Sequence, residues 1–249
     1  MSAAPDWFAD WFNSPWYPIL YDHRDEEEAW RFIARVLQRL ALPGGSHILD
    51  LACGSGRHAA AIQQAGYSCV GVDLAPDAIA QAQEQYAGRA GLSFLVADMR
   101  SLPFRNEFHA VLNLFTSFGY FNSMEENLRV LQNAHRALQA DGWLVIDFLN
   151  AERVERTLVP EETLEKQGIT FNITRHIEDG QVVKRIRFVA DGQSRSYEER
   201  VQLLRRPDFD DLFEQAGFAV QEVWGDYEGG VYIPPTSPRQ VLFARRVEQ

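Results

Sequence analysis

The stretch that decides the fold is "HILDLACGSGRHAAAIQQAG", residues 47–66. It holds a short apolar run, an acid, a glycine-rich turn and then a helical pattern. Residues 54–59 fit the G-x-G-x-x-G/A pattern of nucleotide-binding turns, here between a strand-like and a helix-like segment. Bare glycine backbone and the N-terminus of a helix both let a ligand approach closely. The stretch therefore predicts a strand, a ligand-contacting turn and a helix.

Strand-like and helix-like segments alternate on the carboxyl side of this turn. The strand-like runs lie at residues 47–52, 68–73, 92–98, 109–115 and 143–149, and the helical patterns at 57–65, 76–87 and 125–140. A further helix and two strands follow within residues 207–226 and 240–247. Such alternation is typical of βαβ units. We predict an α/β fold: a doubly wound, Rossmann-like, mostly parallel seven-stranded sheet with helices on both faces.

Two regions depart from this series. Residues 1–44 are first aromatic and then helical, and we expect them to form an N-terminal cap. Residues 151–204 hold three strand-like runs separated by Asp-Gly turns, which predict a small inserted antiparallel segment. The expected core is then residues 45–150 and 205–249. The insertion would serve either as a lid or as a surface for a homodimer.

Composition limits the classes of function. The 249 residues carry a net charge of −11, and no cluster of Lys and Arg offers a groove for a nucleic acid. No run approaches the roughly 18 apolar residues of a membrane-spanning helix. The two cysteines, Cys53 and Cys69, give neither a disulfide framework nor zinc-ligand spacing. We expect a cytoplasmic protein with no metal site, no nucleic-acid partner and no membrane contact.

Asp50, at the end of the first predicted strand, indicates which ligand the turn binds. A dinucleotide would bring a pyrophosphate with about two negative charges to this place, where a carboxylate opposes it. S-adenosylmethionine has a ribose and an adenine but no phosphate, and it carries an ammonium and a sulfonium. The charge of Asp50 therefore favours S-adenosylmethionine over a nicotinamide dinucleotide.

The chain resembles the class I S-adenosylmethionine-dependent methyltransferases along residues 45–150. "HILDLACGSGRHA" is similar to their first motif, "VGVDLAPDAIAQA" to the second and "FLVADMRSLPF" to the third. "FHAVLNLFTSFGYF" resembles the fourth motif, and "LQADGWLVIDF" the strand that follows it. The rest of the chain looks like a bacterial small-molecule branch of the family. The fourth motif lacks the Asn/Asp-Pro-Pro-Tyr run associated with amino methylation of bases or glutamine, which favours a small-molecule acceptor.

The resemblance implies a set of cofactor contacts. Asp50 and the backbone of the glycine turn would hold the methionine part, Asp73 would bind both ribose hydroxyls, and Asp98 would meet the adenine amino group. The implied cofactor-binding residues are Tyr21, Asp50, Ala52, Cys53, Gly54, Gly56, Asp73, Leu74, Asp98, Met99, Leu114 and Phe115. Simpler structural roles stay open for the glycines and the acids. Gly54 and Gly56 could form a tight turn, Asp50 could cap the following helix or pair with Arg57, and Asp73 and Asp98 could be turn residues at strand ends.

Candidate substrate residues come from three places. The aromatic N-terminus, the run after the fourth strand and the Gly/Pro-rich loop near the end of the chain supply Tyr17, His23, Phe118, Tyr232 and Arg239. Each of them has core or strand-end packing as its alternative. No catalytic residue is assigned, because methyl transfer needs a general base only if the acceptor carries its proton at working pH.

These observations predict a methyltransferase that uses S-adenosylmethionine on a small molecule and releases S-adenosylhomocysteine. Two alternatives stay open: an NAD(P)-dependent oxidoreductase on the same fold, and a non-catalytic protein that binds S-adenosylmethionine. The sequence leaves the acceptor open, together with the choice between N-, O-, S- and C-methylation.

Overall fold

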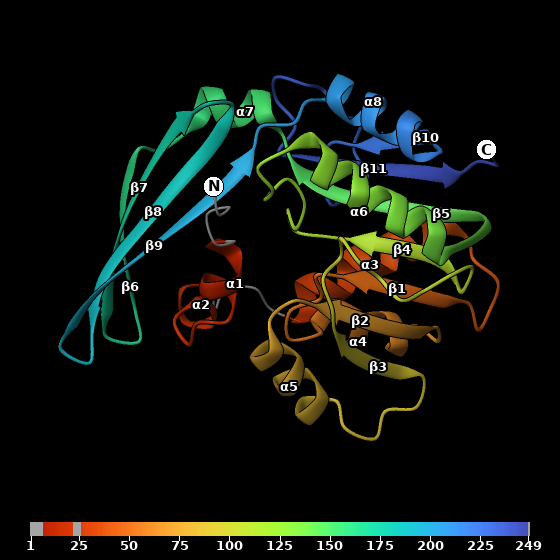
Figure 1. Cartoon of the computed structure of the whole chain (residues 1–249), viewed down its shortest axis with the longest axis horizontal. Coiled ribbons are helices and arrows are strands. Elements are labelled where there is room, and N and C mark those ends of the chain that lie inside the picture. Colours follow the sequence, from red (N-terminus) through yellow and green to blue (C-terminus); the bar gives the residue numbers. More distant parts are fainter. Residues whose placement is uncertain (1–6, 22–25, 249) are drawn as a thin grey trace.

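The computed structural model describes residues 7–21 and 26–248. Its centre is a seven-stranded sheet in the order β10-β11-β5-β4-β1-β2-β3 (Figure 1). The strands are β1 (His47–Leu51), β2 (Ser68–Asp73), β3 (Leu92–Val96), β4 (Phe108–Asn113), β5 (Leu138–Leu149), β10 (Phe218–Trp224) and β11 (Arg239–Arg246). β1 to β5 are mutually parallel, whereas β11 runs antiparallel to both of its neighbours. The predicted doubly wound α/β fold is confirmed.

Helices cover both faces of this sheet, because successive side chains of each strand point to opposite sides. Ile48 of β1 packs into one apolar cluster with α3 (Glu26–Leu40) and α4 (Arg57–Gln64). Its neighbour Leu49 packs into the other, with α6 (Met124–Ala137) and α8 (Arg206–Ala216). Two further helices are α5 (Pro76–Gln85), which lies beside β2 and β3, and α7 (Ala151–Thr157), which follows β5.

A separate antiparallel sheet of four strands stands at one side of the molecule (Figure 1). Its strands are β6 (Glu161–Lys166), β7 (Ile169–Glu178), β8 (Gln181–Ala190) and β9 (Gln193–Gln202), paired in that order. The expectation of three strands was incomplete. β6 is a half-exposed edge strand with the sequence EETLEK, so charged residues hide its pattern.

The N-terminal segment, residues 7–21, lies between the two sheets (Figure 1). It consists of α1 (Trp7–Phe12) and α2 (Tyr17–Leu20). Trp11 is fully buried and packs with Phe171 and Phe188 of the second sheet. The Trp11 indole Nε1 also donates a hydrogen bond of 2.6 Å to Glu199 of β9. One face of the second sheet is therefore covered by this segment.

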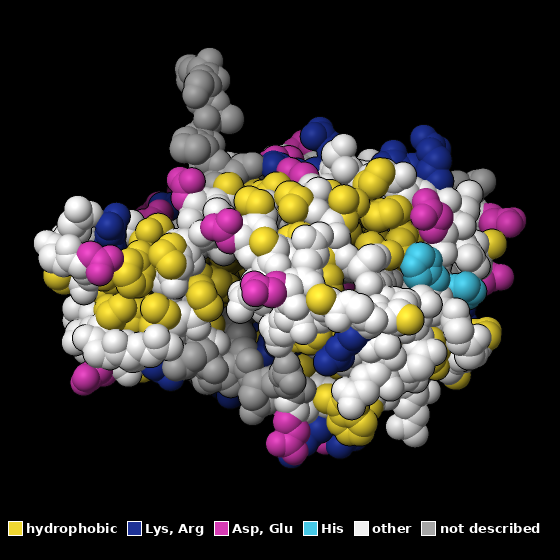
Figure 2. Space-filling model, turned by 90° about the horizontal axis from the view of Figure 1, so that it is seen from below, with side chains coloured by type: hydrophobic (Ala, Val, Ile, Leu, Met, Phe, Trp, Pro, Cys, Tyr) yellow, Lys and Arg dark blue, Asp and Glu magenta, His cyan; other side chains and the backbone are white. Residues whose placement is uncertain are grey.

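The view from below shows where apolar side chains reach the surface (Figure 2). Hydrophobic side chains gather at left, on the part of the molecule that holds the second sheet and the N-terminal segment.

A homodimer through the inserted strands stays a prediction, as do the domain boundaries expected from the sequence.

Candidate functional site

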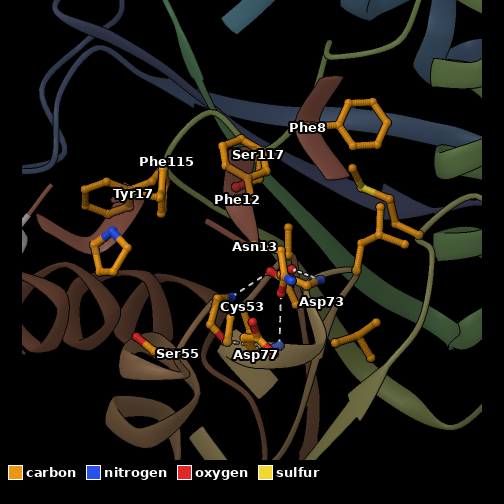
Figure 3. A pocket seen from close by; sticks show the side chains of 18 of the residues that line it. Phe8, Phe12, Asn13, Tyr17, Cys53, Ser55, Asp73, Asp77, Phe115 and Ser117 are labelled. Atoms are coloured by element: carbon orange, nitrogen blue, oxygen red, sulfur yellow. Dashed lines mark hydrogen bonds between the residues drawn. The ribbon is translucent and has the colours of Figure 1, made fainter. Parts of the chain in front are cut away.

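A cavity of about 630 Å³ opens at the carboxyl edge of the seven-stranded sheet, under the N-terminal segment (Figure 3). Its floor comes from the turns that follow β1, β2, β3 and β4, and its roof from α1 and α2. This volume lies within the range of about 300–1,000 Å³ that is typical of small-ligand sites. The edge where parallel strands end is also where ligands bind in this class of fold.

The glycine turn between β1 and α4 contains three left-handed residues, which are Ala52, with φ +59°, and two glycines. Gly54 has φ +54° and Gly56 has φ +85°. A Cβ added at Gly56 would lie 2.5 Å from the Phe94 ring, whereas one at Gly54 would meet nothing within 4 Å. Gly54 therefore faces open space on the cavity wall, and Gly56 packs behind the turn without lining the cavity.

Asp73, at the end of β2, is held by the backbone on both sides. Its Oδ2 accepts a hydrogen bond of 2.8 Å from the Gly54 N–H, and its Oδ1 accepts one of 2.9 Å from the Ala75 N–H. Burial raises the pKa of this carboxyl. Each carboxylate oxygen has a second lone pair for a further donor. Asp73 and Leu74 both line the cavity.

Asp50 lies beneath the turn and is not one of the cavity-lining residues. It is 1% exposed, and the Ala59 N–H and the charge of Arg57 favour its ionised form. Burial, together with the negative charge of Asp73, raises the pKa of Asp50 to about 7. Its Oδ2 accepts no hydrogen bond from the described residues. The predicted direct contact between Asp50 and the ligand stays a prediction, because this side chain lies behind the cavity wall.

Asp98, after β3, lines the cavity next to Met99. The Arg100 guanidinium binds this carboxylate through Nε at 3.0 Å and Nη2 at 2.7 Å, and its Nη1 reaches Glu126 at 2.8 Å. The ion pair fixes the orientation of Asp98. An adenine amino group would have to share the carboxylate with Arg100, for which its lone pairs suffice.

The turn after β4 closes the other end of the cavity. Leu114, Phe115 and Ser117 line it, and both Phe115 and Thr116 are left-handed, with φ of +57° and +59°. The Phe115 N–H donates to Oδ2 of Asp147, on β5, at 2.8 Å. Sequence reasoning missed Asp147. The signal was a lone acid inside the apolar strand "WLVIDFL", where a carboxylate needs buried partners.

The candidate substrate residues divide into two groups. Tyr17 lines the cavity, as does Tyr21, which the resemblance implied as a cofactor contact. Phe8, Phe12 and Asn13, which sequence reasoning did not assign, line it as well. In Figure 3, Tyr17 lies near Phe115 at one end, and Phe8 lies at the other. Aromatic density in the N-terminus was the only signal for this roof.

The other candidates lie away from the cavity or outside the described residues. Phe118 is fully buried in the core against Phe148 and Phe209, because the left-handed Gly119 turns the chain there. The Tyr232 hydroxyl lies 3.4 Å from the Asn150 side chain. Arg239 binds Asp147 and does not line the cavity. His23 lies outside the described residues.

The remaining implied cofactor residues are all on the cavity wall. Ala52 and Cys53 belong to the turn after β1, and Arg57 and His58 follow at the start of α4. Burial raises the pKa of the Cys53 thiol well above its usual value, so this cysteine is a small wall residue rather than a nucleophile.

Comparison with known families places this geometry. Residues 48–142 match the family model described as "Methyltransferase domain". This segment runs from β1 to the first part of β5 and supplies most of the cavity floor.

Curated relatives include YqeM of Bacillus subtilis (strain 168), 27% identical over 128 residues, which are 51% of this chain and 51% of that protein. The chain thus matches about half the length of this relative. Two others match over more of their length. One is a dTDP-3-amino-3,4,6-trideoxy-alpha-D-glucopyranose N,N-dimethyltransferase of Streptomyces venezuelae, 23% identical, covering 79% of this chain and 86% of that one. The other is a glycine/sarcosine N-methyltransferase of Halorhodospira halochloris, 24% identical, covering 89% and 82%.

Solved structures share the fold. An S-adenosylmethionine-dependent methyltransferase from Clostridium acetobutylicum ATCC 824 superposes with a TM-score of 0.80 at 15% identity, over 94% of this chain and 96% of that one. CalS10 with bound S-adenosylmethionine, an amino pentose methyltransferase from Micromonospora echinaspora, gives 0.67 at 22% identity, over 88% and 92%.

Residues 48–142 match a methyltransferase domain, and the chain has the fold of a solved S-adenosylmethionine-dependent methyltransferase. The family match covers residues 48–142, and S-adenosylmethionine is the ligand bound in the similar CalS10 structure. These findings give no support to the oxidoreductase alternative. Within the part of the chain that the structure describes, no helix is long and apolar enough to cross a membrane.

Proposed function

We propose that this protein transfers the methyl group of S-adenosylmethionine to an amino group of a small molecule. The observation that carries the proposal is the two-ended cavity. One end presents the Asp73 carboxylate beside the Gly54 amide, and the other presents the aromatic side chains of Tyr17 and Phe115.

The residues of the cavity fit the proposed cofactor. Asp73 would hold the ribose hydroxyls, Leu74 and Met99 would flank the adenine, and Asp98 would accept its amino group. The open space at Gly54 admits the methionine part close to the backbone. The buried carboxylates of Asp50 and Asp73 favour a ligand whose ammonium and sulfonium are positive.

The cofactor supplies a methyl group on a sulfonium, which is activated for in-line displacement. The protein has to align the acceptor with that methyl group and exclude water. Phe8, Phe12 and Tyr17 form an aromatic roof over the cavity, and this roof would keep water from the reacting atoms. Tyr21 and His58 are two of the wall residues whose side chains could accept a proton, and neither is assigned as a base.

The named relatives suggest the acceptor class. An amino sugar nucleotide and glycine or sarcosine are the acceptors in their names, and both classes offer an amine. An amine attacks as the free base, so transfer should be faster above neutral pH. A cytoplasmic location, expected from the cysteine usage, is part of the proposal.

The test is a turnover screen that measures S-adenosylhomocysteine. The purified protein is incubated with S-adenosylmethionine and glycine, sarcosine or a dTDP-amino sugar, and each amine is paired with its hydroxyl counterpart. We expect turnover with an amine and none with the matched alcohol. Turnover with alcohols alone would contradict the amine assignment. Tight binding of the cofactor without turnover on any acceptor would favour the non-catalytic alternative.

A further inference from the structure

We propose that Asp147 and Arg239 are positioning residues that hold Phe115 as the wall of the cavity at the methionine end of the cofactor. The inference rests on the proposed function, since it concerns how that same site is shaped. Neither residue lines the cavity, so they act through the turn after β4.

Asp147 is the centre of a buried network. It is fully buried, and its Oδ2 accepts hydrogen bonds from the Phe115 N–H at 2.8 Å and from the Tyr227 hydroxyl at 3.1 Å. Its Oδ1 accepts one of 2.8 Å from Arg239 Nε. The Asp147 carbonyl also accepts from the Thr116 N–H at 3.0 Å. One residue of β5 thus binds the backbone of two consecutive residues of the turn.

Arg239 reaches the same turn from β11. While its Nε binds Asp147, its Nη2 donates to the Thr116 hydroxyl oxygen at 2.8 Å. The planar guanidinium makes both bonds at once, which a lysine ammonium cannot reproduce with the same geometry. The guanidinium carbon also lies 5.7 Å from the centre of the Tyr227 ring.

The turn needs this support because it is strained. Phe115 and Thr116 are both left-handed, a conformation in which the Cβ of an L-residue lies too close to the backbone. Two such residues in succession persist only where the surroundings hold them. Asp147 accepts hydrogen bonds from the backbone N–H groups of Phe115 and Thr116, and Arg239 donates one to the Thr116 hydroxyl oxygen. Both strained residues are therefore held by this network.

The conformation places the Phe115 ring against the start of α4. The ring centre is 4.9 Å from that of His58, and the Arg57 guanidinium carbon lies 4.4 Å from it. Tyr227 packs on the same ring at 5.3 Å. The network therefore holds the Phe115 ring against Arg57 and His58, two cavity-lining residues at the start of α4.

Sheet order shows which part of the cofactor this wall meets. β4 lies on one side of β1, and β2 and β3 lie on the other. Asp73 and Asp98, which would bind the nucleoside, follow β2 and β3. Phe115 follows β4 and thus lies at the opposite end, toward the methionine part and the methyl group.

The ion pair between Asp147 and Arg239 has a simpler alternative role, in which it joins β5 to β11 and stabilises the sheet without shaping the cavity. Measured ligand affinities distinguish the two roles. A purely structural role would change the binding of all ligands together, or of none. A positioning role would change the affinity for a ligand that reaches Phe115 and spare one that ends at the ribose.

The experiment compares two ligands on four proteins by isothermal titration calorimetry. S-adenosylmethionine spans the cavity, and 5′-methylthioadenosine keeps the nucleoside and the sulfur but lacks the amino-acid part. The proteins are wild type, Asp147→Asn, Arg239→Lys and the control Arg245→Lys. Arg245 is on the same strand as Arg239, but its guanidinium lies over Trp143 at 3.9 Å. Hydrogen exchange at the Phe115 amide is measured on the same samples.

We expect Asp147→Asn and Arg239→Lys to weaken S-adenosylmethionine roughly tenfold and 5′-methylthioadenosine less than about twofold. Exchange at the Phe115 amide should accelerate in both, and Arg245→Lys should match wild type. Proportional weakening of both ligands, or no change in either, would overturn the positioning role. Failure of the wild-type protein to bind S-adenosylmethionine would instead refute the proposed function.

Discussion

Asp73 and Gly54 are joined by a hydrogen bond of 2.8 Å from the Gly54 N–H to the carboxylate Oδ2. The bond ties the end of β2 to the turn that follows β1, and both residues line the cavity. The acid expected to bind the ribose thus also orients the turn expected to bind the methionine part. One side chain couples the two halves of the cofactor site.

Asp73→Ala should therefore weaken S-adenosylmethionine binding by about 1–3 kcal/mol, which is roughly fivefold to 150-fold, because it removes the ribose acceptor and frees the turn. Calorimetric titration measures the change. Asp211→Ala, an exposed acid on α8, is the control and should bind like wild type. Unchanged affinity in Asp73→Ala would refute the ribose assignment.

Alanine at the two glycines of the turn should separate folding from binding. Gly54→Ala and Gly56→Ala both place a side chain in left-handed backbone, at about 1–2 kcal/mol each. Gly56→Ala also forces a Cβ to 2.5 Å from Phe94, so its free energy of unfolding should fall further. Gly54→Ala should lose ligand affinity instead, since its Cβ enters the cavity.

Urea unfolding and calorimetry check both variants, with Gly88→Ala as the reference for strain alone. Gly88 has φ +78° and open space around it. Equal stability of Gly56→Ala and Gly88→Ala would mean that Phe94 yields without cost.

The buried Asp50 should make stability depend on pH. Its pKa is about 7 in the folded protein, against an ordinary value of 3.8 for an aspartate in the unfolded chain. Between these values the folded state binds more protons, so the free energy of unfolding should fall as pH rises from about 4 to about 7. Urea unfolding of the ligand-free protein at several pH values tests this.

Asp50→Asn should flatten this dependence without removing it, because burial also raises the pKa of Asp73. Stability of the wild type that rises through pH 5–7, with the same slope in Asp50→Asn, would show that Asp50 is ionised in the folded protein throughout.

We expect Glu199 to hold in place the N-terminal segment, which forms the roof of the cavity. Its Oε1 accepts hydrogen bonds from the Trp11 indole at 2.6 Å and from the Tyr21 hydroxyl at 2.7 Å, so β9 binds both α1 and the residue that follows α2. Glu199→Ala should speed hydrogen exchange in residues 7–21 and weaken S-adenosylmethionine binding several-fold. Glu178→Ala, on the same sheet and paired with Arg200, is the control. Unchanged exchange would mean that apolar packing alone holds the segment.

The sequence predicted the parts of the molecule that follow local rules. Residues 68–73 were assigned as a strand with the observed bounds, because an apolar run ended by an acid and a proline-initiated helix leaves little choice. Gly54 and Asp73, which the sequence placed in one ligand site, do line the same cavity, since they follow β1 and β2 directly. Their contacts with the cofactor stay a prediction.

What the sequence could not supply depends on contacts between distant segments. β5 begins at Leu138 rather than at Trp143, because Leu138 already pairs with Phe108 of β4 ahead of an irregularity in the register. Phe118 was assigned to the substrate although it turns into the core, and Asp147 was overlooked although it anchors the turn beside it. The sequence around an aromatic residue or an acid does not indicate whether its side chain lines a cavity or lies in the core.

The most direct test of the account is calorimetric titration with S-adenosylmethionine, S-adenosylhomocysteine and NAD in parallel. The account predicts micromolar binding of both adenosyl ligands and no response to NAD. Binding of NAD with no response to either adenosyl ligand would contradict it.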